Sequence, residues 1–195
     1  MIIQFLILFI SGSIAGLLAG LLGLGGATIM VPLYLYYFKI QNQLPLSHQY
    51  HMAIGCSLAV IFINSIFATR EHYKAKTINF DVVKRFLPGL VLGILVGTYL
   101  SHLIGGLTLT KLFALFLALT AIQIFFQKKP SAHRNISPIL FHGTAFFVGI
   151  LNTLFGIAGG IVMVPFFIFI GFNIKHAIGT SIALAIPISL IANIV

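Results

Sequence analysis

Apolar segments long enough to cross a lipid bilayer recur from one end of this chain to the other. Of its 195 residues, 59% are hydrophobic and only 7% are charged. A soluble domain carries about 25% charged residues, and a disordered chain has low hydrophobicity, so both classes are excluded. The sequence therefore predicts an all-α, polytopic helical membrane protein.

Six apolar runs are separated by short polar segments. In chain order they are Gln4–Phe38, His51–Thr69, Phe86–Ile104, Thr108–Phe126, Ile139–Phe172 and a run from Ala177 that is still apolar at Val195. Each has at least the length of a membrane-spanning helix.

The first and fifth runs are too long for one straight helix. As a continuous helix, Gln4–Phe38 would extend about 52 Å, against a hydrocarbon core of about 30 Å. Each run is expected to break, tilt or re-enter the membrane, and glycine clusters near Gly23–Gly26 and Gly156–Gly160 are where a helix would break. Pro32 and Pro165 would then lie shortly inside the second piece, in a first turn that tolerates proline.

The net charge of +9 comes from eleven basic residues against two acids, Glu71 and Asp81. Because the basic residues lie in short loops between apolar runs, the positive-inside rule explains them and no nucleic-acid partner is predicted. Counting each interrupted run as one crossing divides all eleven between two sides. One side holds Arg70, Lys74, Lys76, Lys84, Arg85, Lys128, Lys129 and Arg134, and the other holds Lys39, Lys111 and Lys175. We therefore expect a multi-pass protein of the cell (inner or plasma) membrane with the 70–85 and 127–138 loops and the N-terminus in the cytoplasm.

Two blocks of sequence recur in the same order. Gly23–Pro32 matches Gly156–Pro165 with an offset of 133 residues, and Ala53–Ala59 matches Ala177–Ala183 with an offset of 124. This pattern predicts two sequence-similar halves packed around a pseudo-symmetry axis, parallel or inverted. Transporters are commonly built this way, with sites where the broken helices of the halves meet.

The repeat divides the chain into three segments. We expect a first transmembrane repeat over 1–126, a cytoplasmic linker over 127–138 and a second transmembrane repeat over 139–195. The second repeat has no counterpart of Phe86–Ile104 or Thr108–Phe126, and the chain ends inside an apolar run. It is therefore expected to be truncated.

Residues at the two predicted breaks are the candidate substrate ligands. The free N–H groups and positive dipole end of a broken helix can face an anion, while close helix packing is the alternative role for glycine. Serine hydroxyls beside a break could ligate an oxyanion, or a cation together with freed carbonyls, or could bond back to their own helix. The predicted substrate-binding residues are Gly25, Gly26, Cys56, Ser57, Gly159, Gly160, Thr180 and Ser181.

Cys56 aligns with Thr180, which favours a role as a small polar packing residue over a role as a reactive thiol.

Two glycine trios spaced by four residues predict close helix packing along one face. They are Gly12, Gly16 and Gly20, and Gly89, Gly93 and Gly97.

Catalytic and cofactor chemistry is not predicted. Neither acid falls within a span, so the chain offers no carboxylate for an intramembrane proton relay. The seven histidines lie mainly in loops and form no metal-ligand pattern, and the sequence has no Gly-Lys-Ser/Thr nucleotide loop. We expect no enzyme activity, no metal and no cofactor.

The glycine motifs and the block after them resemble the TauE/SafE family of sulfite and organosulfonate exporters. The motifs are Gly23-Leu-Gly-Gly-x4-Val-Pro32, Gly156-Ile-Ala-Gly-Gly-x3-Val-Pro165 and Ala177-Ile-Gly-Thr-Ser181. The resemblance covers essentially the whole chain and implies two similar halves with further C-terminal helices. Three departures bear on the substrate: Ala27 replaces a glycine, Ala158 interrupts the second cluster, and Cys56 stands where threonine is often found.

What the resemblance implies is export of small sulfur-containing anions by alternating access between the two repeats. Two other classes stay open: an uncoupled anion channel or permease, which the lack of membrane carboxylates favours modestly, and a non-transport membrane scaffold. The expected partners are a small anionic substrate and the lipid bilayer, and the sequence leaves a homo-oligomer open.

Overall fold

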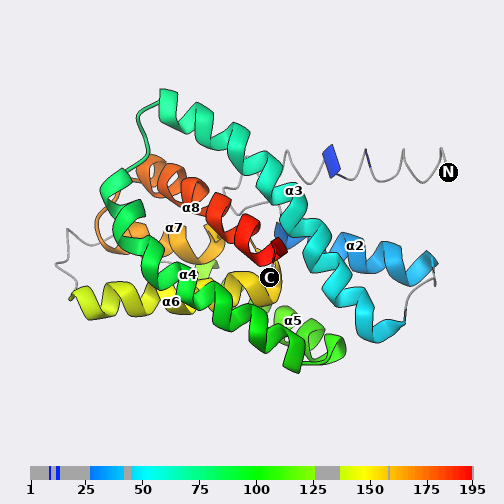
Figure 1. Cartoon of the computed structure of the whole chain (residues 1–195). Helices are drawn as coiled ribbons and strands as arrows, with labels where there is room; N and C mark the ends of the chain where they lie inside the picture. The colour runs from blue at the N-terminus through cyan, green and yellow to red at the C-terminus, as the bar shows by residue number, and fades with distance from the viewer. Residues whose placement is uncertain are drawn as a thin grey trace.

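The computed structural model describes residues 9, 12–13, 27–41, 45–125, 137–157 and 159–194. Within these residues the regular structure is entirely helical (Figure 1). The helices are α2 (Ala27–Gln41), α3 (Leu46–Lys74), α4 (Phe80–Leu103), α5 (Gly106–Phe125), α6 (Pro138–Phe155), α7 (Gly160–Phe169) and α8 (Ile174–Ile194). Five of them, α3, α4, α5, α6 and α8, are long and apolar enough to cross a membrane, and α7 is a shorter apolar helix. The predicted class, an all-α polytopic helical membrane protein, is confirmed.

The predicted run Ile139–Phe172 is divided into α6 and α7 at its glycine cluster, as the sequence indicates. The matching break near Gly23–Gly26 falls outside the described residues. So do four glycines that the sequence singled out: Gly16, Gly20, Gly25 and Gly26.

The predicted position of the prolines is wrong. Pro165 is the sixth residue of α7, and Pro32 follows five residues that are already helical in α2, so both prolines lie beyond a first turn. Each removes one backbone N–H from the helix interior, which membrane helices tolerate where neighbouring groups compensate.

Helices α4 and α6 run in the same direction and touch along a seam of glycines. A Cβ atom at Gly89 would lie 2.7 Å from the carbonyl oxygen of His142, and one at Gly97 would lie 2.9 Å from the Cα of Ile150. A Cβ at Gly93 would collide with the carbonyl oxygen of Phe146. The predicted packing role of these three glycines is therefore confirmed, because backbones this close leave no space for a side chain.

Helix α7 turns back along α6 instead of continuing across the bundle. At the break, a Cβ on Gly159 would lie 3.0 Å from Nδ2 of Asn152. At the other end of α7, the ring centroids of Phe166 and Phe141 are 6.1 Å apart, although Phe141 lies at the start of α6. The two helices are therefore antiparallel, and the second long run re-enters the bundle (Figure 1).

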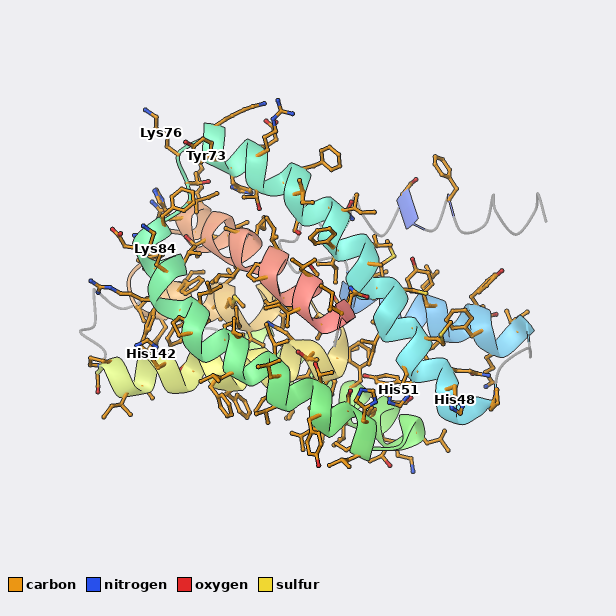
Figure 2. All side chains as sticks on the ribbon, in the orientation of Figure 1. His48, His51, Tyr73, Lys76, Lys84 and His142 are labelled. Atoms are coloured by element: carbon orange, nitrogen blue, oxygen red, sulfur yellow. The ribbon has the colours of Figure 1, made fainter. Side chains whose placement is uncertain are left out.

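This reversal corrects the predicted single crossing and the side assigned to Lys175. A Cβ on Gly179 in α8 would lie 2.7 Å from Oγ1 of Thr77, which belongs to the loop between α3 and α4. Helix α8, with Lys175 in its first turn, therefore starts at the end of the bundle where α3 ends and α4 begins. We call this the basic end, after Arg70, Lys74, Lys76, Lys84 and Arg85. Figure 2 shows Lys76 and Lys84 there, with His48 and His51 at the opposite end of α3.

Two apolar clusters fill the interior. One gathers Phe86, Phe141, Phe166 and Phe167 from α4, α6 and α7, with ring centroids of Phe86 and Phe141 5.2 Å apart. These rings lie towards the basic end and hold α7 folded against α4 and α6. The other cluster packs α3 against the α6–α7 break and α5.

The glycine seam makes a stability prediction. Gly93→Ala places a methyl group against the backbone of α6 and is expected to destabilise the fold by about 1–3 kcal/mol. The matched control is Gly143→Ala on α6, where an added Cβ has nothing within 4 Å. Thermal melting in detergent, followed by circular dichroism, should show a lower melting temperature for Gly93→Ala only. Equal melting temperatures for both variants would contradict the close contact.

Candidate functional site

The α6–α7 break contains two positions whose backbone conformation favours glycine. Gly156 follows the last residue of α6 and is left-handed, with φ of 63° and ψ of 34°, and the N–H of Ile157 donates to the carbonyl of Asn152 at 3.0 Å. This pattern is a glycine-terminated helix end of the Schellman type. Gly159, with φ of 76°, then precedes the first turn of α7. The two left-handed residues reverse the chain at a point where both are buried.

Helix α3 supplies hydrogen-bond donors to the end of α6. The hydroxyl of Ser57 donates to the carbonyl of Gly156 at 3.1 Å, and the hydroxyl of Tyr50 donates to the carbonyl of Leu154 at 3.3 Å. Ser57 is 0% exposed and Tyr50 is 1% exposed. Carbonyls at the end of a helix have no partner within it, and water cannot reach these. The two hydroxyls therefore satisfy groups that the break leaves open.

Ser57 lies near the middle of α3, so the break lies inside the bundle and not at a surface. A Cβ on Gly156 would be 3.1 Å from Cγ2 of Ile54, one turn before Ser57. This contact brings the backbone of α3 directly against the break. Irregular backbone at membrane depth is tolerated where protein covers it or where it lines a cavity.

Asn152 is a polar residue at the break that sequence reasoning missed. Its side chain is 0% exposed, and neither Nδ2 nor Oδ1 has a hydrogen-bond partner. Nδ2 lies beside Gly159, at the start of α7. An available signal was the lone side-chain amide of the apolar run Ile139–Phe172, one turn before the glycine cluster.

The hydroxyls of α8 lie elsewhere. The hydroxyl of Thr180 accepts a hydrogen bond from the N–H of Asn79 at 3.1 Å, in the loop before α4, and Ser181 donates to the carbonyl of Ile178 at 2.8 Å. Thr180 therefore binds the α3–α4 loop, and Ser181 bonds back to its own helix. Cys56 is a free, half-buried thiol next to Ser57 on α3. Of the predicted ligands in the described residues, Ser57, Gly159 and Gly160 are the ones that meet at the break.

The electrostatics of the break favour an anion. The N-terminal end of α7 carries the partial positive charge of a helix dipole. The only acids of the chain are Glu71 and Asp81, and both belong to the basic end, where Glu71 pairs with Lys74 at 2.7 Å. No carboxylate of this chain is therefore available to neutralise the start of α7. The described residues hold no group of three or more His, Cys, Asp or Glu side chains placed to bind a metal.

The bond from Ser57 predicts a selective loss of stability. Ser57→Ala leaves a buried carbonyl without its partner and is expected to cost about 1–3 kcal/mol. The matched control is Ser65→Ala on the same helix, because the Ser65 hydroxyl bonds only to the carbonyl of Phe62 in its own turn. That change should stay within about 0.5 kcal/mol. The measurement is denaturant unfolding in detergent, and similar losses in both variants would show that the bond across helices contributes little.

Comparison with known proteins agrees with this architecture. The family model described as sulfite exporter TauE/SafE matches residues 8–195. A probable membrane transporter protein of Methanocaldococcus jannaschii is 31% identical over 197 residues, covering 97% of this chain and 70% of its own length. One from Haemophilus influenzae is 31% identical over 180 residues, covering 90% of this chain and 67% of its own.

The probable membrane transporter protein YunE of Bacillus subtilis is also 31% identical, over 182 residues and 83% of this chain, which spans 66% of its length. No solved structure matches significantly. The family model matches nearly the whole chain, and the relatives are named as membrane transporters. Both agree with the spanning helices and the glycine-broken run of the structure. This multi-pass membrane protein belongs to the TauE/SafE family.

Proposed function

We propose that this protein exports small sulfur-containing anions, such as sulfite or organosulfonates, from the cell. The description of the family model names sulfite as the exported compound. The α6–α7 break carries the proposal. There a helix N-terminus without an available carboxylate lies within the bundle, against Ser57 of α3. Anions are stabilised at such helix ends, and transporters use them as substrate sites.

We further propose alternating access between the two repeats. The support lies in the sequence, where Gly23–Pro32 and Gly156–Pro165 match with one offset of 133 residues. Ser57, in the first repeat, bonds to the break in the second. A change in how the repeats pack would therefore act directly on the proposed site, which is what alternating access requires.

The orientation follows from charge. Lys175 lies at the basic end, so five loop-flanking cations and Lys175 gather on one side of the described bundle. Excess Lys and Arg lie on the cytoplasmic side of membrane proteins. We therefore propose that the protein lies in the plasma (inner) membrane with its basic end facing the cytoplasm.

Flux measurements test the function. Proteoliposomes containing the chain should take up radiolabelled sulfite, and unlabelled sulfite inside should accelerate that uptake, as a carrier that alternates between two states requires. The transport rate of the Ser57→Ala/Ser181→Ala double variant should fall about tenfold or more, through the loss of the Ser57 bond at the break, since Ser181 bonds within α8. Circular dichroism of each preparation checks that the variant is folded.

The same experiment separates the other classes. Flux that follows the sulfite gradient without acceleration by internal substrate would identify an uncoupled channel and contradict alternating access. Absence of flux for sulfite and for sulfoacetate, from protein shown to be folded, would contradict the proposed substrate class.

A further inference from the structure

We propose that Asn152 is a substrate ligand and that its side-chain amide, together with the first N–H groups of α7, forms an oxyanion-binding site. This inference rests on the proposed function and adds to it a specific residue and the chemistry of the bound group. The site takes a small anion that presents oxygen acceptors, as sulfite and sulfonates do.

The state of Asn152 is the first observation. Its side chain is 0% exposed, and both of its polar atoms lack a hydrogen-bond partner. Buried side-chain polar atoms in proteins are nearly always paired, because an unpaired one loses its hydration and gains nothing in return. A leucine of similar size would fill this position without that cost. An amide kept free at this point is therefore explained by a partner that binds from outside the chain.

The second observation is where the amide lies. Nδ2 is beside Gly159, and a Cβ there would approach it to 3.0 Å, so the missing side chain leaves the amide next to the start of α7. The carbonyl of Gly159 accepts hydrogen bonds from the N–H groups of Val162 and Met163, at 3.2 and 2.7 Å. Within the described part of the chain, the N–H groups of Gly160 and Ile161 donate to no backbone carbonyl. The amide of Asn152 therefore lies beside the residue that directly precedes the first N–H groups of α7.

Charge decides the class of ligand. Nδ2 of Asn152 and the first N–H groups of α7 donate hydrogen bonds, and the start of α7 carries partial positive charge. A cation is disfavoured at this point, because the start of α7 carries partial positive charge and the two acids of the chain, Glu71 and Asp81, lie at the basic end. Sδ of Met163 would lie 3.1 Å from a Cβ at Gly159, so an apolar side chain also borders this point. These donors and this charge match a small oxyanion.

Equilibrium dialysis of the purified chain with radiolabelled sulfite, and separately with radiolabelled sulfate, tests the site. Asn152→Leu removes the amide while keeping the volume, and Asn152→Asp keeps the shape while placing negative charge beside α7. Both variants should bind about 10- to 100-fold more weakly than the unmodified chain, the loss expected for a hydrogen bond to a charged group. Asn193→Leu is the matched control, since its amide is exposed on α8 and bonds to its own helix; it should bind normally.

Melting temperatures without ligand separate a binding role from a structural one. Asn152→Leu should melt at or above the temperature of the unmodified chain, because it removes an unpaired buried polar group. Sulfite should raise the melting temperature of the unmodified chain and leave that of Asn152→Leu unchanged.

The outcomes distinguish this inference from the proposed function. If the chain transports sulfite while Asn152→Leu or Asn152→Asp binds it with unchanged affinity, the role of Asn152 is wrong and the function stands. If oxyanion binding depends on Asn152 but no sulfur anion crosses the liposome membrane, the site stands and the proposed function is wrong. Failure of the unmodified chain to bind either anion overturns the site.

Discussion

The break between α6 and α7 depends on one constraint: inside a bilayer, every backbone carbonyl needs a hydrogen-bond donor from the protein. The last turn of α6 exposes such carbonyls in the middle of the bundle. The hydroxyls of Ser57 and Tyr50, both on α3, donate to those of Gly156 and Leu154. The break can therefore exist at this depth only while α3 lies against it, so the packing of α3 fixes the local structure at the end of α6.

The reversal of α7 follows from the same region and gives it its chemistry. Left-handed glycines at 156 and 159 turn the chain, and the contacts of Phe166 with Phe86 and Phe141 hold α7 against the start of α6. Because α7 turns back, its N-terminus faces the interior of the bundle. A helix dipole without a carboxylate, in surroundings that exclude water, attracts an anion more strongly than the same dipole at a surface.

Much of this architecture could be predicted from sequence. Apolar length and glycine spacing predict the spanning helices, the break in the second long run and the α4–α6 seam, because these depend on local composition. The direction of α7 could not be predicted. Glycine permits a break but does not determine the new direction, because that depends on contacts between phenylalanines that are distant in the sequence. Lys175 was assigned to the wrong side for that reason. The matched sequence blocks did not indicate Asn152, because the residue 133 positions before it is Ala19. The binding roles of all the predicted ligands stay predictions: Gly25, Gly26, Cys56, Ser57, Gly159, Gly160, Thr180 and Ser181.

The position of a bound anion tests the central claim most directly. Selenite has the shape and charge of sulfite, and selenium scatters X-rays anomalously, so crystals grown with selenite would locate the ligand without a model of it. We predict an anomalous peak at the α6–α7 break, within hydrogen-bond reach of Asn152 and the N–H groups of Gly160 and Ile161. A peak elsewhere in the bundle, with this break free of selenium, would contradict the assignment of the anion site.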